Sequence, residues 1–287
     1  YKGVAKVDKV VMEVVSPDNI VSEMKAGNYD IATMPNAQYE AYKDLTNVTF
    51  LSSQESAYEY IGFHLGKYDT AAGKNVTDPN AKMSDANLRQ AMAYALDVEA
   101  AGQNLYNGLQ HASNSIIIPF FKDVYNKDQE GFTYNPEKAK AEFAKAKTAL
   151  QAEGVKFPIH LDMPVDQTNT TKVQRVQSLK QSLEATLGTD NVVVDIQQLQ
   201  KDDVLNITYF AETAAGEDWD ISDNVGWSPD FADPSTYLDI IKPSVGENTK
   251  TYLGFDSGTN NAAAKQVGLE DYEKMVVEAG EETTDVS

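Results

Sequence analysis

The spacing of apolar residues in the second half of the chain constrains the fold more than any other feature. Apolar and polar residues alternate over residues 157–163, which is typical of a strand with one buried face. Apolar residues take helical spacing over residues 173–187 and return to strand patterns over 192–196 and 219–225, with a short helix expected at 205–210. This alternation predicts an α/β lobe with a largely parallel sheet, because each helix returns the chain to the starting edge of the sheet.

The first part of the chain contains another strand–helix–strand unit. Residues 9–15 are rich in β-branched side chains, which favour a strand. Ser16-Pro17 is a typical helix start, and Gly27 is a typical helix end before the next expected strand at residues 29–34. Further strands are expected at residues 48–51 and 59–64. A chain of 287 residues is long enough to form two lobes.

Three helices are expected between these units, and each begins at a side chain that can accept a hydrogen bond from the first turn. Ser84 is the expected cap of the first helix, and Asp97 is the expected cap of the second. Asn135, which a proline follows, begins a third helix that ends at Gly154. The polar residues 66–82 between the first lobe and these helices are expected to form a surface loop.

Charge and cysteine content exclude several classes of function. The net charge is −20, from 44 acidic and 24 basic side chains, so the chain repels nucleic acid and anionic lipid. The absence of cysteine excludes disulfides, thiolate catalysis and cysteine-ligated zinc. The sequence contains no apolar run long enough for a spanning helix, and it opens without the pattern of a secretory signal.

Motifs of known enzyme classes are absent from the sequence. It contains no phosphate-binding loop, no Gly-x-Ser-x-Gly elbow, no His-Glu-x-x-His motif and no dinucleotide fingerprint. The three histidines, His64, His111 and His160, are too scattered to predict a metal site. We therefore expect no enzymatic activity, no metal and no cofactor. Asp230 and Asp233 leave a glycosidase-like carboxylate pair as the remaining catalytic alternative.

The candidate site lies in residues 218–239, which hold both tryptophans. The expected strand that begins at Trp219 breaks at Gly226, and Asp230 then lies on an irregular segment. Carboxylates and an aromatic ring on a loop after a strand indicate a ligand-binding site, because loops at strand ends carry most sites. The alternative is an ordinary turn, with solvated acids and with Trp227 in the core.

Four segments resemble one protein family. Residues 226–234, Gly-Trp-Ser-Pro-Asp-Phe-Ala-Asp-Pro, are similar to the G-W-x-x-D-Y-x-D-P segment of the family 5 extracellular solute-binding proteins. Residues 88–97, Leu-Arg-Gln-Ala-Met-Ala-Tyr-Ala-Leu-Asp, resemble a helix of the same family, and residues 27–31 and 58–65 fit two further segments. His64 stands where an asparagine is common in that family.

The resemblance implies a fold and a cellular location. It implies a periplasmic-binding-protein-like α/β fold (type II, cluster C), in which two lobes contain mostly parallel sheets. Residues 1–117 would form part of the first lobe and the approach to the hinge, and residues 118–287 a second lobe truncated at its C-terminus. The chain would then be an internal fragment of a longer receptor. That receptor would be held at the extracellular face of the cell membrane by a lipid anchor outside this chain.

The resemblance also implies a function. The protein would be the substrate-binding component of an ABC importer, would bind an oligopeptide between its lobes and would pass it to the permease subunits in the membrane. A strand edge at residues 225–228 would pair with the peptide backbone, Asp230 would hold the α-ammonium group, and Trp227 would line the pocket. Gly226, Ser228 and His64 complete the expected peptide-binding residues. We expect a monomer with no nucleic-acid partner.

Three alternatives remain open at the level of the sequence. A member of this family can bind a different ligand, such as a metal chelate or a glycan, which would require converging arginine or histidine side chains. The protein can also serve as a peptide-sensing receptor that needs no permease. The third alternative is a hydrolase, which turnover of a peptide or a sugar would reveal.

Overall fold

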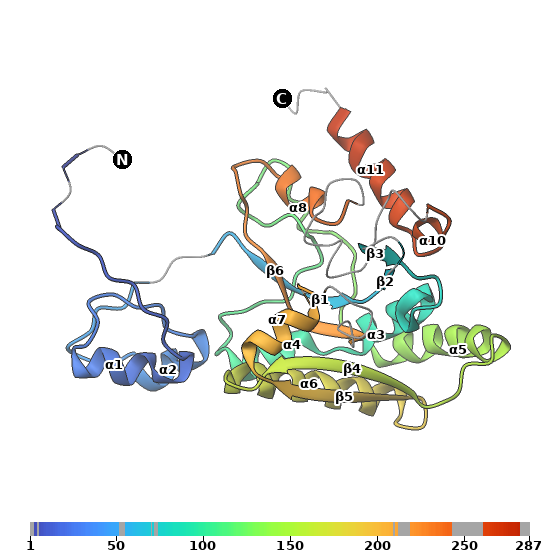
Figure 1. Cartoon of the computed structure of the whole chain (residues 1–287), viewed down its shortest axis with the longest axis horizontal. Coiled ribbons are helices and arrows are strands. Elements are labelled where there is room, and N and C mark those ends of the chain that lie inside the picture. The colour runs from blue at the N-terminus through green and yellow to red at the C-terminus, as the bar shows by residue number, and fades with distance from the viewer. Residues whose placement is uncertain are drawn as a thin grey trace.

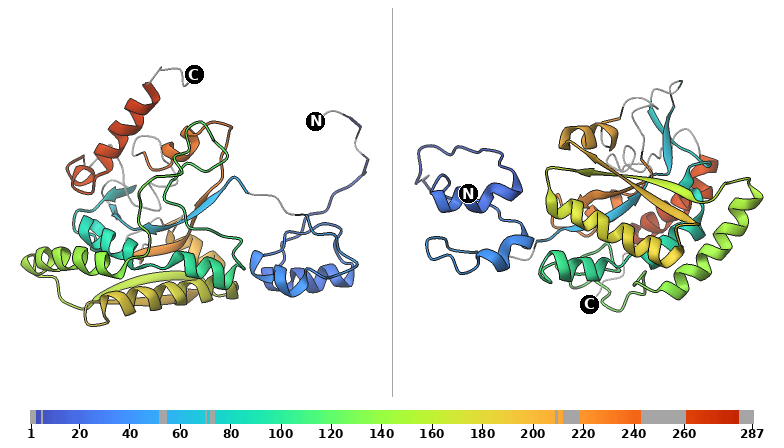
Figure 2. Two further views of the ribbon diagram at one scale, coloured as in Figure 1. Left: turned by 180° about the vertical axis from the view of Figure 1, so that it is seen from behind. Right: turned by 90° about the horizontal axis from the view of Figure 1, so that it is seen from below.

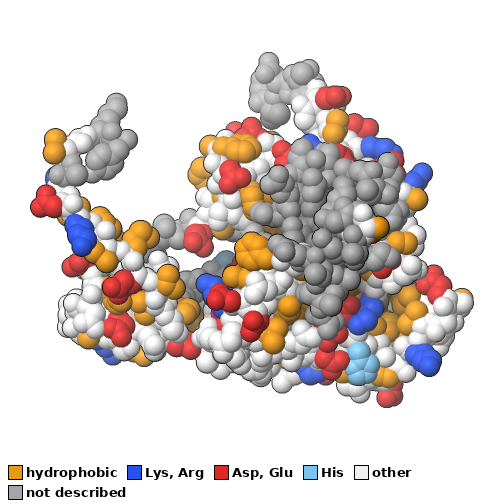
Figure 3. All heavy atoms as spheres, viewed as in Figure 1, with side chains coloured by type: hydrophobic (Ala, Val, Ile, Leu, Met, Phe, Trp, Pro, Cys, Tyr) orange, Lys and Arg blue, Asp and Glu red, His pale blue; other side chains and the backbone are white. Residues whose placement is uncertain are grey.

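The computed structural model describes residues 3–4, 6–51, 55–69, 71, 74–208, 210–211, 219–242 and 261–281. Figure 1 shows an N-terminal segment, residues 6–51, beside a main body that contains all the strands of the described part of the chain. The two further views in Figure 2 agree that this segment projects from one side of the main body. Acidic side chains are scattered over both parts in Figure 3, as the net charge of −20 leads one to expect.

The N-terminal segment contains only short helices. A 3-10 turn, η1 (Pro17–Asn19), leads into α1 (Ile20–Ala26), and another, η2 (Asn36–Gln38), leads into α2 (Tyr39–Tyr42). Gly27 ends α1 in the left-handed conformation with φ of 74°, as expected of a C-terminal glycine. The Ser16 hydroxyl makes no capping hydrogen bond, so the fixed φ of Pro17 is the local signal that starts the helix.

The strands expected at residues 9–15, 29–34 and 48–51 do not form. These residues have no regular secondary structure, and no strand pairs with them within the described ranges. Their large apolar side chains face solvent, with Val14 99% exposed and Ile31 90% exposed. Figure 3 accordingly shows hydrophobic side chains on the surface of this segment. The prediction was wrong because β-branched residues favour an extended backbone, whereas a strand also needs a neighbouring strand for its hydrogen bonds.

The parallel strand pair predicted from residues 157–196 is confirmed. Strand β4 (Ile159–Asp166) leads through α6 (Thr170–Leu187) to β5 (Val192–Leu199), and the two strands pair in parallel from Ile159↔Val192 to Asp166↔Leu199. The side chain of Asn169 caps α6, and Gly188 follows its last residue. Figure 2 shows α6 lying alongside the two strands. Helix α7 (Lys201–Thr208) begins a few residues before the predicted position.

Three further helices cover the middle of the chain. After a 3-10 turn, η3 (Lys82–Ser84), helices α3 (Ala86–Ala95) and α4 (Val98–Leu105) are followed by α5 (Pro136–Ala152). Asp97 and Asn135 cap α4 and α5 as predicted. The predicted cap at Ser84 is wrong, because Ser84 belongs to the 3-10 turn and the Asp85 carboxylate accepts the hydrogen bond from Leu88 N at 2.7 Å.

Two antiparallel strand pairs complete the main body. Strand β1 (Tyr58–Phe63) pairs with β6 (Ile221–Trp227), and β6 begins beside β4, where Asp220 N–H donates to the Asp162 carbonyl at 2.9 Å. Strands β2 (Gly66–Asp69) and β3 (Lys74–Thr77) pair within the predicted loop of residues 66–82, so that prediction was wrong. Buried Val76 and Thr77 hold β3 in place, although its polar sequence gave no strand signal.

The last part of the chain adds short helices. Helix α8 (Ser235–Asp239) follows β6, and α10 (Asn261–Gln266) and α11 (Leu269–Glu281) follow later. The sequence also predicts a helix at residues 269–279, which α11 confirms. The surface loop that Pro243, Gly246, Gly254 and Gly258 predict lies outside the described residues. In the part of the chain that is described, every helix is too short or too polar to cross a lipid bilayer.

One hydrophobic core joins α3, α5, α6 and the strands. The core contains residues from both sides of residue 117, so the division of the chain into lobes at that position stays a prediction. The largest fully buried core side chains include Met83 on η3, and others lie on these helices and on β4 and β6: Leu88, Met92, Leu161, Met163, Leu179, Leu183 and Ile221.

Candidate functional site

The β1–β6 ladder positions four of the five predicted site residues together. Tyr58 pairs with Trp227 and Glu59 pairs with Gly226 at one end of the ladder. Ser228 and Asp230 continue the chain directly after this end. The candidate site is therefore the end of β6 and the turn that follows, residues 226–230, which leads into α8 (Figure 1).

Thr236 in the first turn of α8 organises the candidate site. Its buried hydroxyl oxygen accepts a hydrogen bond from Trp227 Nε1–H at 3.1 Å and another from the Asp230 backbone N–H at 3.2 Å. One side chain thus fixes both the indole and the backbone that carries the Asp230 carboxylate. The Asp230 side chain itself is exposed, and Trp227 is half-buried.

Asp233 has a structural role in the same turn. Its carboxylate accepts a hydrogen bond from the Ser235 backbone N–H at 2.9 Å. Hydrogen bonds from Ser235 hold the pKa of Asp233 below its usual value. A carboxylate used in this way fits the start of α8, as an acid near a helix N-terminus does. The Asp233 carboxylate is therefore engaged in the turn that leads into α8.

An aromatic cluster supports the site from one face of the ladder. The ring of Tyr58 lies 5.7 Å from that of Tyr60 and 5.5 Å from that of Tyr237. Tyr237 is fully buried, and its hydroxyl donates to the Ser56 carbonyl at 2.7 Å. Phe121 contacts the same ring at 5.8 Å. These contacts fasten α8, and hence Thr236, to the strand that pairs with Trp227.

Gly226 is required by the close approach of the two strands. A Cβ atom at this position would lie 2.9 Å from the Tyr58 carbonyl oxygen, which is a backbone atom that cannot move away by changing a rotamer. The glycine thus allows β1 and β6 to stay paired up to Trp227.

His64 lies at the opposite end of the ladder. Its backbone N–H donates to the Asp220 carbonyl at 2.9 Å, its Nδ1 lies 3.0 Å from the Trp219 carbonyl oxygen, and its ring stacks on that of Trp219 at 4.5 Å. Burial lowers the pKa of His64 to about 4, which keeps the imidazole neutral. The ladder places His64 roughly 20 Å from Trp227, at about 3.3 Å per residue. The structure therefore does not bring His64 together with the other four residues.

Sequence reasoning missed the charged residues beneath the site. Arg175 on α6 and Asp223 on β6 form an ion pair in the interior, with side chains 9% and 3% exposed. An acid in the middle of the expected strand at residues 219–225 was the available signal, because a buried acid is almost always paired. Thr236 gave no signal, since threonine is common in turns and at helix starts.

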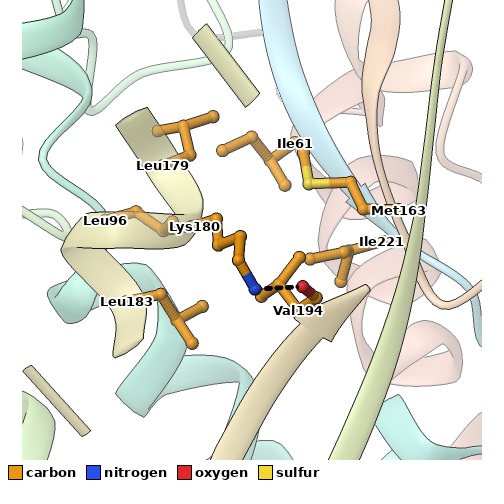
Figure 4. A pocket seen from close by; sticks show the side chains of 8 residues that line it. All are labelled: Ile61, Leu96, Met163, Leu179, Lys180, Leu183, Val194 and Ile221. Atoms are coloured by element: carbon orange, nitrogen blue, oxygen red, sulfur yellow. Dashed lines mark hydrogen bonds between the residues drawn. The ribbon is translucent and has the colours of Figure 1, made fainter. Parts of the chain in front are cut away.

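A small void lies between α6 and the strands but forms no ligand site. Figure 4 shows its lining residues, Ile61, Leu96, Met163, Leu179, Lys180, Leu183, Val194 and Ile221. Its volume of about 10 Å³ is close to that of a single water-sized sphere, and its walls are almost entirely apolar. The Lys180 ammonium donates to the Val194 carbonyl oxygen at the wall of the void (Figure 4). Among the described residues, no three histidine or carboxylate side chains converge as a metal site would require.

The chain matches one protein family over most of its length. The family model is that of the bacterial extracellular solute-binding proteins, family 5 Middle, and it matches residues 1–249. The chain is 81% identical over 280 residues to the oligopeptide-binding protein AliA of Streptococcus pneumoniae, with 86% of this chain and 42% of AliA covered. It is 51% identical to the oligopeptide-binding protein SarA of Streptococcus gordonii over 288 residues, with 89% of this chain and 42% of SarA covered.

A solved structure has the same fold. The structure described as lactococcal OppA complexed with an endogenous peptide in the closed conformation superposes with a TM-score of 0.69 at 23% identity. The match covers 92% of this chain and 51% of that chain, so the present chain spans about half the length of OppA and less than half that of AliA and SarA. The chain belongs to the family 5 extracellular solute-binding proteins of bacteria and has their periplasmic-binding-protein-like α/β fold.

Proposed function

We propose that this chain binds oligopeptides as part of the substrate-binding component of an ABC importer, with the peptide at the end of β6. The observation that supports this most is the preorganised turn at residues 226–230, where Thr236 fixes both Trp227 and the backbone of Asp230. The relatives AliA and SarA are oligopeptide-binding proteins of about twice this length. The activity of the whole protein is therefore part of the proposal.

Backbone pairing would make the binding independent of peptide sequence. In the described part of the chain only β1 pairs with β6, so the second edge of β6 near residues 225–228 has backbone groups that an extended peptide can pair with. Main-chain hydrogen bonds of this kind supply affinity without reading side chains. The half-buried face of Trp227 offers a flat apolar surface that accepts different side chains.

Asp230 would bind the α-ammonium group of the peptide. Its carboxylate is exposed, while its backbone N–H is held by Thr236, so little conformational freedom is lost on binding. A carboxylate–ammonium hydrogen bond is charge-assisted and is strong where water is excluded. Peptides with a free N-terminus should thus bind more tightly than N-acetylated ones.

Tryptophan fluorescence tests the site directly, since the chain has two tryptophans and one of them lies in it. We expect a saturable change when mixed-sequence peptides of about three to ten residues are added at micromolar concentration, near −8 kcal/mol. The variant Asp230→Asn and N-acetylation of the peptides should each weaken binding at least about tenfold, or 1.4 kcal/mol. The matched control Asp190→Asn removes the same charge from an exposed turn and should bind as the unchanged chain does.

The outcomes of this titration separate the parts of the proposal. Binding that ignores both Asp230→Asn and acetylation would remove the role of Asp230 and keep the peptide receptor. Absence of binding by any peptide, in this chain and in the full-length protein, would refute peptide binding. Saturation by a metal chelate or a glycan instead would favour a different ligand class.

We further propose how the full-length protein works. It would be a monomer, held by a lipid anchor at the extracellular face of the membrane, that passes its peptide to the permease subunits. Family membership supports an extracellular solute-binding role.

Three experiments test these parts of the proposal. Light scattering should give the mass of one chain, 31.5 kDa, for the present protein. Mass spectrometry should recover the bound peptide uncleaved, whereas cleavage would indicate a hydrolase. Loss of peptide import on deletion would distinguish transport from sensing.

A further inference from the structure

The ion pair beneath the candidate site is the strongest feature that the proposed function does not use. Arg175 Nε and Asp223 Oδ2 lie 2.6 Å apart, with the N–H not aligned on the oxygen, so the contact is an ion pair rather than a linear hydrogen bond. Burial raises the pKa of the Asp223 carboxyl, and the positive charge of Arg175 opposes that rise. Buried pairs of this kind add little net stability, so their main effect is to favour one arrangement of the groups they join.

The Arg175 guanidinium is held from several directions. Its terminal nitrogen donates to the Gln110 side-chain oxygen at 3.0 Å, and its Cζ atom lies 5.8 Å from the ring centre of Tyr106. Glu59 on β1 approaches it at 4.0 Å. These partners restrict the position of the Arg175 guanidinium and thereby that of the Asp223 carboxylate paired with it.

Lys172, one turn earlier on α6, extends the network to the backbone of β6. Its ammonium lies 3.6 Å from the Glu59 carboxylate and donates to the Asp223 carbonyl oxygen at 3.4 Å. Asp223 is thus held by both its side chain and its backbone. Two cations from α6 balance two carboxylates from β1 and β6, and the network carries no net charge.

Asp223 lies in an irregular part of β6. The ladder pairs Tyr60 with Val225 and Gly62 with Ser222, so β6 contains one residue more than β1 over this interval. The extra residue makes a β-bulge at Asp223 and Asn224. A bulge bends its strand, increases the local twist and changes where the following side chains point.

The bulge determines the direction in which the side chains of the candidate site point. The side chains of Asp223 and Glu59 point toward α6, where Arg175 contacts both. Those of Trp227 and Tyr58 point to the other side, where Thr236 and Tyr237 lie. The indole of Trp227 therefore reaches Thr236 only if the bulge keeps its present geometry.

We propose that Arg175 and Asp223 are positioning residues, which hold the bulge of β6 and thereby orient Trp227 and the turn to Asp230. Neither side chain touches the peptide in this scheme. Their effect on peptide affinity rests on the proposed function, whereas their effect on the orientation of Trp227 can be measured without a ligand.

The first readout is the nuclear magnetic resonance signal of each indole N–H group. A residue that only stabilises the fold would leave these signal positions unchanged when it is substituted. The two tryptophans give two signals, which Trp227→Phe assigns. The signal of Trp227 reports its hydrogen bond to Thr236, and that of Trp219, which stacks on His64 at the far end of the ladder, serves as an internal reference. We expect Arg175→Met and Asp223→Asn to shift the Trp227 signal and to leave the Trp219 signal in place.

The affinity for a mixed-sequence library of six-residue peptides supplies the second readout. We expect each of these two variants to bind the library at least tenfold more weakly than the unchanged chain. Arg175→Lys keeps the charge but not the planar guanidinium, so it should lose less affinity than Arg175→Met. It should also remain folded even if Arg175→Met does not fold. The double variant Arg175→Met/Asp223→Asn should be more stable than Arg175→Met alone, because it leaves no unpaired charge inside.

Arg89→Met is the matched control for loss of a partly buried arginine. The Arg89 guanidinium donates to the carbonyls of Met83, Ser84 and Val267, away from β6. We expect this variant to lower the melting temperature without shifting the Trp227 signal or weakening the peptide affinity. If Arg175→Met and Arg175→Lys behave as Arg89→Met does, the positioning role is refuted. If neither the unchanged chain nor the full-length protein binds peptide, the proposed function fails, and the Trp227 signal alone decides between positioning and a structural role.

Discussion

At the scale of single residues, His64 links stability to pH. Burial holds its pKa near 4 in the folded chain, against about 6.5 in the unfolded chain. Between these values the unfolded chain binds the additional proton, so stability falls as the pH decreases from 7 to 4. The shift corresponds to a loss of about 3 kcal/mol at the acidic end.

Urea unfolding at pH 7 and at pH 4.5 measures this effect. The variant His64→Asn removes the titrating ring, and its stability should depend on pH less steeply than that of the unchanged chain. His160→Gln is the control, because His160 is exposed and pairs with Asp195 on the surface. Equal pH dependence of His64→Asn and the unchanged chain would show that burial of His64 does not control this transition.

Gly226 makes a second prediction at this scale. The Cβ atom of Gly226→Ala would lie 2.9 Å from the Tyr58 carbonyl oxygen, so the end of the ladder has to shift. We expect a loss of about 1–3 kcal/mol in the free energy of unfolding, as for overpacking elsewhere. Gly280→Ala in α11 has open space around the new Cβ and should be neutral or slightly stabilising. A melting temperature of Gly226→Ala equal to that of Gly280→Ala would contradict the close approach.

The break between β6 and the following turn was easier to predict from the sequence than the groups that hold this turn in place. Gly226, Trp227 and Asp230 follow from a strand that breaks at a turn, which is a local pattern. The pairing of Arg175 with Asp223 joins residues 48 positions apart in the sequence, and a single sequence does not show which charges meet in the interior. The same holds for Thr236, whose role depends on where the indole lies.

At the scale of secondary-structure elements, α6 fastens itself to β5 by an ion pair. Lys180 and Glu184 contact each other, and together they satisfy the backbone of Val194, whose N–H donates to Glu184 at 2.9 Å and whose carbonyl accepts from Lys180 (Figure 4). Removing the carboxylate in Glu184→Ala leaves the Val194 N–H without its acceptor. We expect a loss of about 1–3 kcal/mol of stability, the usual effect of an unsatisfied buried donor.

Glu142→Ala is the control for this prediction. Glu142 on α5 is similarly exposed, at 19% against 16% for Glu184, and its ion-pair partner is Lys145 on the same helix. An ion pair within one helix contributes only about 0.3–0.5 kcal/mol. Chemical denaturation should therefore show a larger loss in the free energy of unfolding for Glu184→Ala than for Glu142→Ala. Equal losses would show that the hydrogen bond to Val194 does not contribute the expected stability.

Helices were more predictable than strands for a physical reason. The residues that begin and end a helix act on backbone groups only a few positions away in the sequence. Examples are the caps Asp97 and Asn135 and the terminal glycines Gly27 and Gly188. A strand is complete only when a distant segment pairs with it, which is why residues 9–15 form no strand. The β4–α6–β5 unit was predictable because its pairing partners are joined by a single helix.

At the scale of the whole molecule, Asn107 and Thr170 connect the main body to the N-terminal segment by hydrogen bonds within the described part of the chain. Asn107, which has a positive φ of 55°, donates its side-chain amide to the carbonyls of Asn36 at 3.0 Å and of Ala37 at 3.3 Å. Thr170 at the start of α6 donates to the Asp18 carboxylate at 3.0 Å. The contact of Asn107 therefore carries a large share of the polar connection between the two parts.

Asn107→Gly tests this contact without adding backbone strain. Glycine keeps the left-handed conformation and removes only the side-chain amide. We expect faster hydrogen exchange and earlier proteolytic cleavage in residues 36–51, with an unchanged melting temperature of the main body. Asn107→Asp, which also tolerates this conformation but cannot donate, should behave in the same way. Unchanged exchange in both variants would show that other contacts hold the segment.

The most direct test of the central claim is hydrogen exchange of the chain with and without saturating six-residue peptides. Binding by strand addition at the end of β6 predicts slower exchange in residues 225–230 on addition of peptide, and no change around His64 at the far end of the ladder. With N-acetylated peptides the same protection should require at least about tenfold more peptide, because their affinity is expected to be that much weaker. Saturable binding that leaves the exchange of residues 225–230 unchanged would contradict the account.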